Sequence, residues 1–436
     1  MLVSIVLIFL LLVAFLRLRD WAKYGQMHKK SRFRLLSKAK KLLNKEAWEE
    51  AEKILLLLYE NGERSPDLWL LYSQVLRGTN RVEEALRWIA FGARKYPNDL
   101  SFLLEEGQIL LRLKKWEESL QKIVRATPLI RSEEDHLALA TALYYTDHFE
   151  DAWMILSPFL ERTRNGFVLT LAADTLVAMG ANQEAIPLYV HALGRGGKRH
   201  HILLALGNAY HQTGQLKEAE AVFQKILMRD RSDIAATLGL GACMEEKNFY
   251  NKALALYQST PVWTSGDLSI LKQAGISALH LQKFELARDC FSQILEKHPP
   301  TPLYLSYFGY SLECLQRWEE AEEVYLQMIR LFPHHPHGYR TLAWIFGSGH
   351  SHQLTPDEGI AFAHKGLKLL PDPISWEILS ACIARMGNYE KAYEIQHYLF
   401  TSIDDQQERA RRQIAMRVLR GKNPLSDTQI KRGLVA

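Results

Sequence analysis

Hydrophobic residues along most of the chain recur at the spacing of amphipathic helices, with short polar turns between them. In the stretch LGNAYHQTGQLKEAEAVF, residues 206–223, this spacing predicts two helices joined at Gly214. Weaker copies of the stretch return about every 34 residues. A chain of 436 residues is long enough for two or three ordinary domains or for one extended array. The repetition favours the array, built from helix pairs.

Four consecutive copies share one register, in which Leu206 takes position 7 of a 34-residue repeat. Position 8 is glycine in all four copies and position 20 is alanine, in agreement with a close crossing of the first helix over the second. Large aromatic residues at positions 17 and 24 would fill the space that the small residues leave. The residues that show this are Gly207, Gly241, Gly275, Gly309, Ala219, Ala253, Ala287, Ala321, Tyr250, Phe284, Trp318, Phe223, Tyr257, Phe291 and Tyr325. Pro299 and Pro333 would end the second helix of their repeats.

This pattern resembles the tetratricopeptide repeat. The resemblance implies an all-α fold, a right-handed superhelical solenoid of about eleven helix pairs over residues 32–403, in which each pair is stabilised by its neighbours. Residues 404–421 predict a capping helix with Ile414, Val418 and Leu419 on the apolar side and arginines opposite. Residues 422–436 predict a flexible tail.

The N-terminal segment MLVSIVLIFLLLVAFL has no charged side chain. A helix of this length spans roughly 24 Å, somewhat less than the roughly 30 Å of a bilayer core. Positive charge follows the apolar run instead of preceding it, so an uncleaved transmembrane anchor over residues 1–18 is favoured over a signal peptide. Residues 19–31 then form a basic juxtamembrane segment. The residues expected at the membrane surface are Arg17, Arg19, Trp21 and Lys23.

The basic residues after the anchor place the rest of the chain on the cytoplasmic side. We therefore expect a single-pass protein of the bacterial inner membrane, in contact with the bilayer through residues 1–18. The net charge is only +5, and the basic residues gather at the two ends of the chain. A protein that binds nucleic acid would carry basic charge over its body, so no nucleic-acid partner is expected. A nucleic-acid binder that uses the basic ends stays open as a rival.

No motif predicts a cofactor, a metal or a small-molecule substrate, and we expect no enzymatic activity. The four cysteines, Cys243, Cys290, Cys314 and Cys382, form no CxxC pair, and three of them lie in an apolar helix pattern that fits a buried free thiol. The histidines of HHPH (334–337) and GHSH (349–352) are too far apart along a helix to share an ion and fit surface loops. GRGGKR (194–199) lacks the phosphate-loop pattern. An enzyme with a site in residues 347–357 stays open as a second rival.

The resemblance also implies a concave binding surface, faced by positions 2, 5, 6, 9 and 12 of each repeat. Position 5 is leucine in most of the earlier repeats, although the same leucines also fit a helix core. The candidate groove residues are Leu70, Leu104, Leu137, Tyr144, Leu204, Asn208, His211 and Leu238. A clamp for acidic chaperone C-termini is not expected, because Asn208 alone matches its pattern while Leu204, Gly239, Ser269 and Gln273 cannot hold a carboxylate.

The layout of an N-terminal anchor followed by these repeats resembles the lipopolysaccharide assembly protein B family. That family ends in a rubredoxin-like module of paired CxxC motifs, which this sequence lacks, so the resemblance is limited to layout. We expect a membrane-anchored scaffold that binds partner proteins or peptides in its groove, in the assembly or regulation of an envelope or secretion complex. An import or chaperone receptor on an organelle membrane is the alternative.

Overall fold

The computed structural model describes residues 29–195, 199–351, 353–402, 405–426 and 429. Regular secondary structure in these residues is entirely helical, with 23 α-helices and two short 3-10 helices. The chain divides into two compact units, Met1–Thr213 and Gly214–Ala436. The all-helical class predicted from the sequence is confirmed.

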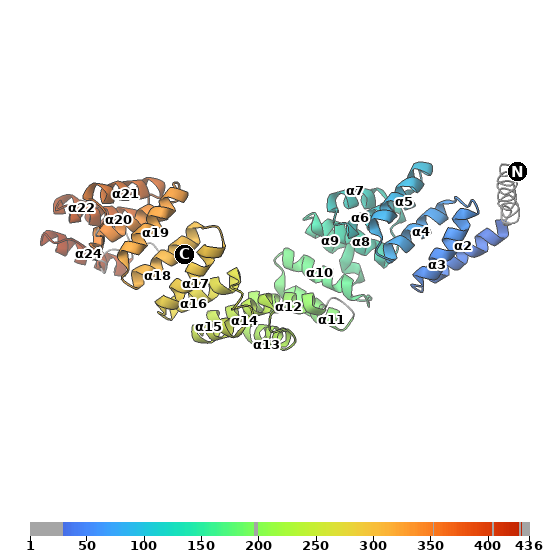
Figure 1. Ribbon diagram of the computed structural model, residues 1–436, viewed down its shortest axis with the longest axis horizontal. Helices are drawn as coiled ribbons and strands as arrows, with labels where there is room; N and C mark the ends of the chain where they lie inside the picture. The colour runs from blue at the N-terminus through green and yellow to red at the C-terminus, as the bar shows by residue number, and fades with distance from the viewer. Residues whose placement is uncertain (1–28, 196–198, 352, 403–404, 427–428, 430–436) are drawn as a thin grey trace, which may run out of the picture. The chain divides into compact units, whose positions relative to one another are not determined.

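In the first unit, helices adjacent in sequence pack as pairs, and each pair packs on the next (Figure 1). The helices are α2 (Lys29–Leu43), α3 (Trp48–Glu60), α4 (Pro66–Gly78), α5 (Val82–Lys95), α6 (Leu100–Arg112), α7 (Trp116–Arg125), α8 (Glu133–Tyr145), α9 (Phe149–Leu156), α10 (Gly166–Ala178), α11 (Asn182–Leu193) and α12 (Arg199–Gln212). The 3-10 helices η1 (Thr127–Leu129) and η2 (Ser157–Phe159) follow α7 and α9.

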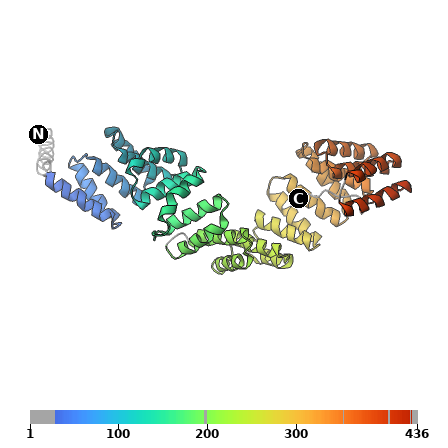
Figure 2. The same ribbon diagram turned by 180° about the vertical axis from the view of Figure 1, so that it is seen from behind.

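The second unit continues the same alternation, which Figure 2 shows from behind. Its helices are α13 (Leu216–Leu227), α14 (Ile234–Glu246), α15 (Tyr250–Ser259), α16 (Leu268–His280), α17 (Phe284–Lys297), α18 (Pro302–Cys314), α19 (Trp318–Leu331), α20 (Pro336–Ser348), α21 (Pro356–Leu369), α22 (Pro373–Arg385), α23 (Tyr389–Thr401) and α24 (Gln406–Arg420).

The turn between the two helices of a pair depends on one residue in the left-handed backbone region. This residue is glycine in four of the turns, at Gly180, Gly214, Gly349 and Gly387, where it adopts the conformation without steric cost. Elsewhere a polar residue takes the same conformation, in phase with the repeat. These residues are Glu46, Asn80, Lys114, Asp147, Asn248, Gln282 and Gln316.

The predicted role of the small residues is confirmed at the helix crossings. A Cβ at Gly241 would lie 2.5 Å from Cζ of Tyr257, and one at Gly275 would lie 2.7 Å from Cζ of Phe291. Both rings are completely or almost completely buried, so they have no room to move aside. Glycine at position 8 therefore admits the aromatic ring at position 24 of the same repeat.

The predicted anchor, residues 1–18, lies outside the described residues. Among the helices that the structure does describe, none combines the length and the apolar character needed to cross a bilayer. The last residues of the predicted juxtamembrane segment, from Lys29 onward, belong to α2.

The C-terminal helix α24 packs differently from the prediction. Ile414, expected on the apolar side, is exposed, whereas Arg412, expected opposite, is buried. The physical reason is Glu377 of α22, a buried carboxylate that requires cationic partners and receives them from Arg411 and Arg412. Leu425, placed by the sequence in a flexible tail, is buried in the same apolar cluster as α20 and α22.

Candidate protein-binding groove

A hollow of about 690 Å³ opens on the first unit, over α4 and α6. The residues that matter for its chemistry are Leu70, Gln74 and Arg77 of α4 and Leu104, Glu105 and Gln108 of α6. In the repeat numbering these are positions 5, 9 and 12 of one repeat and positions 5, 6 and 9 of the next. The hollow therefore lies on the face that the tetratricopeptide resemblance assigned to binding.

Two of the candidate leucines, Leu70 and Leu104, line this hollow. Both are half-buried. Each also packs against a buried apolar cluster, Leu70 with the core around α3 to α5 and Leu104 with the core around α8 and α9. Each leucine can therefore belong to the core and to a binding surface at the same time, because one edge of its side chain faces the core and another faces the hollow.

The other candidate groove residues lie outside the hollow. Leu137, Tyr144, Leu204 and His211 are half-buried and Asn208 is exposed, all within the first unit, while Leu238 is half-buried on α14 in the second unit. The Tyr144 ring meets those of Tyr145 and Phe149 edge-on, with centroids 5.2 and 5.6 Å apart. The predicted membrane-surface residues, Arg17, Arg19, Trp21 and Lys23, lie outside the described residues.

The floor of the hollow carries a fixed ion pair between α4 and α6. Arg77 Nε lies 3.2 Å from Glu105 Oε1, and its Nη2 donates to Oε2 at 3.4 Å. The Ser73 hydroxyl donates to the same carboxylate at 3.1 Å. Glu105 is only 4% exposed. Burial raises the pKa of Glu105, and the Arg77 guanidinium opposes this rise.

The rim of the hollow is polar. Glu134, at the start of α8, is 73% exposed and lies 3.6 Å from Arg77 Nη1. Gln108 Nε2 donates to Asp135 Oδ1 at 3.0 Å. Leucine walls with amide and carboxylate groups above them suit a peptide, which offers apolar side chains together with backbone donors and acceptors. In the described part of the chain, no group of three or more His, Cys, Asp or Glu residues is placed to hold a metal ion.

Sequence reasoning missed Gln74, Arg77, Glu105 and Gln108. A signal for them was present, because Arg77 and Glu105 interrupt apolar helices at groove-facing positions of consecutive repeats. A surface role was the ordinary expectation for each of these residues taken alone. Their proximity shows only when the two helices are placed side by side.

A second polar cluster links three helices of the first unit. The Tyr189 hydroxyl of α11 donates to Asp174 Oδ1 of α10 at 2.6 Å. The other carboxylate oxygen of Asp174 lies 3.1 Å from Nε2 of His201 on α12. Burial and the Asp174 charge both raise the pKa of Tyr189, so this hydroxyl stays a hydrogen-bond donor.

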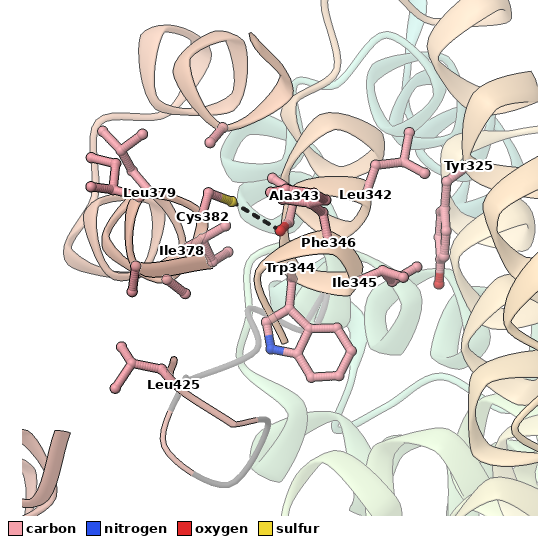
Figure 3. Packing of buried hydrophobic residues seen from close by; sticks show 14 of the residues in the cluster. Tyr325, Leu342, Ala343, Trp344, Ile345, Phe346, Ile378, Leu379, Cys382 and Leu425 are labelled. Atoms are coloured by element: carbon pink, nitrogen blue, oxygen red, sulfur yellow. Dashed lines mark hydrogen bonds between the residues drawn. The ribbon is translucent and has the colours of Figure 1, made fainter. Parts of the chain in front are cut away.

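The corresponding face is closed at the C-terminal end of the second unit. A Cβ at Gly347 of α20 would lie 3.0 Å from Cβ of Ala381 on α22. Cys382 Sγ lies 3.1 Å from the Ala343 carbonyl oxygen, which brings the two helices into direct contact (Figure 3). Trp344 and Glu377, at positions that face the groove in earlier repeats, are buried here. These two helices therefore leave no room for a peptide between them.

The structure separates the histidines that were predicted in surface loops. His334 is exposed in the turn before α20, as predicted. His337 is buried in the first turn of α20. The His350 ring stacks on Trp318, with centroids 4.0 Å apart. Burial lowers the pKa of His335. The surface prediction was wrong for His337 because α20 begins at Pro336, and the first turn of this helix is part of the packed core. His352 lies outside the described residues.

Comparison with known proteins agrees with this architecture. Residues 176–237 and 272–336 match models of the tetratricopeptide repeat. Within these two segments the chain carries tetratricopeptide repeats. Two solved structures align with the chain at low similarity. A tetratricopeptide repeat protein from Parabacteroides merdae is 13% identical with a TM-score of 0.42, and the alignment covers 65% of this chain and 98% of that one. Pseudomonas aeruginosa PilF is 14% identical with a TM-score of 0.38, and the alignment covers 46% of this chain and 91% of that one.

One curated relative is similar in sequence over part of its length. The Vi polysaccharide export protein VexE of Salmonella typhi is 31% identical over 299 residues, which is 63% of this chain. The match spans 42% of the length of VexE.

Proposed function

We propose that this tetratricopeptide repeat protein is a scaffold without catalytic activity of its own, and that it holds a segment of a partner protein in the hollow over α4 and α6. The observation that carries the proposal is the position of the hollow, which combines two half-buried leucines with the groove-facing polar residues of consecutive repeats. The Arg77–Glu105 pair fixes the spacing of the two helices beneath it. A preformed hollow binds a flexible segment without first having to reorganise.

The proposed setting is the bacterial envelope, in the assembly or export of a surface polymer. The partial similarity to the polysaccharide export protein VexE supports this setting. We further propose that residues 1–18 anchor the chain in the inner membrane, with the N-terminus outside and the repeats in the cytoplasm. The apolar N-terminal run and the basic residues after it support this topology.

The groove proposal is tested by crosslinking in membranes followed by a pull-down. Leu70→Glu together with Leu104→Glu places two carboxylates in the hollow, and we expect crosslinked partners to be lost. Gln74→Arg is a milder variant that fills the hollow without disturbing the core. The matched control replaces two leucines of the second unit that are also half-buried and also pack against an apolar cluster, Leu281→Glu and Leu286→Glu. Recovery of the same partners from wild type, Gln74→Arg and the leucine variant contradicts the proposal.

The anchor is tested separately by carbonate extraction of membranes. A chain anchored through residues 1–18 stays in the membrane pellet at alkaline pH. Release into the supernatant contradicts the anchor but leaves the groove proposal untouched.

A further inference from the structure

The first described helix, α2, is strongly cationic. Its sequence, KKSRFRLLSKAKKLL, contains seven Lys and Arg residues and no Asp or Glu. Arg34, Lys38 and Lys41 are all exposed, and they follow one another at spacings of four and three residues. Side chains at these spacings share one side of a helix. The three cations therefore form a stripe along α2, which we call the α2 stripe.

The α2 stripe is not neutralised by neighbouring carboxylates. Arg32, on the same helix, lies 3.8 Å from Glu63 and also donates to the Asn61 carbonyl oxygen. In contrast, no member of the stripe forms an ion pair with another residue that the structure describes. The first acidic residue after the stripe is Glu46, in the turn beyond the end of the helix. The positive charge of the stripe is therefore available to a partner.

An aromatic side chain lies beside the stripe. Phe33 is 74% exposed, although water disfavours so large an apolar group at the surface. The opposite side of α2 packs on α3 and α4 through Ala39 and Leu43, so the folding of the repeat does not use Phe33. A cationic row beside an exposed aromatic ring is the arrangement by which helices bind at the surface of anionic membranes.

We propose that the α2 stripe, together with Phe33, docks the first unit onto an anionic lipid surface. Each cation near such a surface strengthens binding about fivefold, and the aromatic ring enters the interface between headgroups and acyl chains. Charge complementarity alone also fits a nucleic acid. The lipid surface is favoured because a long apolar run lies upstream of α2, at residues 1–16, and because the chain between its basic ends is acidic overall. The docking is separate from partner binding in the hollow.

The test places an environment-sensitive fluorophore on α2 of the full chain. Ser37→Cys supplies an exposed attachment point next to the stripe, and Cys314→Ser removes the half-exposed native thiol. The labelled chain is added to vesicles of phosphatidylcholine alone or with about 30% phosphatidylglycerol, a content chosen to resemble an anionic leaflet. We expect a blue shift of the emission with the anionic vesicles only, and its loss at high salt. The readout is local to α2, so it does not depend on how the rest of the chain reaches the vesicle.

Neutralising the stripe identifies the residues responsible. The stripe variant combines Arg34→Gln, Lys38→Gln and Lys41→Gln. We expect its ratio of docked to undocked helix to be roughly a hundredfold lower than that of wild type, about fivefold for each charge removed. The matched control removes three exposed cations from the second unit, Lys217→Gln, Lys225→Gln and Arg229→Gln, and should behave as wild type. Phe33→Ala should weaken docking at every salt concentration.

Three outcomes overturn the proposal. The first is an equal shift with vesicles of phosphatidylcholine alone. The second is an equal loss of docking in the stripe variant and in the control variant, because the net charge of the chain would then be responsible for docking instead of the stripe. The third is displacement of α2 from vesicles by a short DNA duplex at equal phosphate concentration, which would make the face a general polyanion site. None of these results bears on the pull-down that tests the hollow.

Discussion

Arg77 and Glu105 form a two-point ion pair across α4 and α6, beneath the hollow that we assign to partner binding. Their side chains are 16% and 4% exposed. Charges this deep are costly to remove from water, so each depends on the other. The pair fixes the spacing of the two helices, which makes it a structural part of the hollow and leaves the leucines and amides above it for the ligand.

Removing Glu105 should destabilise the first unit strongly. Glu105→Ala leaves the Arg77 guanidinium without its buried partner, and we expect a loss of about 3 kcal/mol in the free energy of unfolding. Glu134→Ala removes an exposed carboxylate near the same guanidinium and should cost less than about 0.5 kcal/mol. Urea unfolding followed by circular dichroism measures both variants. Equal losses for the two glutamates would show that the buried pair does not stabilise the unit.

A second buried pair holds the C-terminal helix. Glu377 of α22 is 1% exposed, and Oε2 of its carboxylate accepts from Arg411 Nη2 at 2.8 Å and lies 3.4 Å from Arg412 Nη2. We expect Glu377→Ala to cost about 3 kcal/mol and to release α24 from the repeats. Hydrogen exchange of residues 406–420 should then accelerate while that of α18 stays slow. Glu394→Ala, an exposed site on α23, is the control and should leave exchange in α24 unchanged.

The repeat was predictable because it depends on local features. The crossings of helix pairs require small residues, such as Gly241 and Gly275, at fixed positions, and a period of 34 residues shows them directly. The turns between helices were harder to predict. Residues such as Lys114 and Gln316 adopt a left-handed backbone conformation there, although neither residue type favours it. There the repeat context overrides a steric preference of about 1 kcal/mol.

The polar interior was not predictable from the same pattern. A charged residue on an amphipathic helix is normally assigned to the surface, and this assignment fails for Arg412 because its partner, Glu377, lies on a different helix. The candidate site likewise has a part that the sequence predicted and a part that it did not. Leu70 and Leu104 were predicted as groove residues because they occupy position 5, which faces the groove in the family that the repeats resemble. The proximity of Arg77 to Glu105, in contrast, depends on how α4 packs beside α6.

The glycine at position 8 offers a direct test of the helix crossing. A Cβ at Gly241 would lie 2.1 Å from the Tyr257 hydroxyl oxygen, which itself donates to Glu245 at 3.1 Å. We expect Gly241→Ala to cost about 2 kcal/mol through overpacking. Tyr257→Leu in the same chain makes room and should recover part of this loss. Gly194→Ala is the control, because its nearest atom would be 3.7 Å away, and it should be nearly neutral.

The cysteines should differ in their reactivity toward an aromatic disulfide reagent. Cys314 is half-exposed, whereas Cys243, Cys290 and Cys382 are buried. Burial raises the pKa of Cys243 to about 11 and that of Cys290 to about 12, so these thiols are neither accessible nor ionised at pH 8. We expect one thiol to react rapidly in the native chain and all four after unfolding in urea. Rapid reaction of more than one native thiol would contradict the packing around α14, α17 or α22.

Cys382 should also make stability depend on pH in the alkaline range. Burial raises the pKa of its thiol from 9.0 to about 12. A raised pKa means that the folded state disfavours the thiolate, so the stabilisation by the neutral thiol is complete below pH 9 and is lost as the pH rises toward 12. In the unfolded chain the thiol ionises freely above pH 9, which favours unfolding. We therefore expect the advantage of wild type over Cys382→Ala, measured by urea unfolding, to be constant from pH 7 to 8.5 and to shrink above pH 9. The Cys382 side chain is completely buried and contacts the Ala343 carbonyl oxygen, and both features disfavour its thiolate in the folded state. An advantage of wild type that stays constant up to pH 11 would instead show that the thiol ionises equally well in the folded and unfolded states.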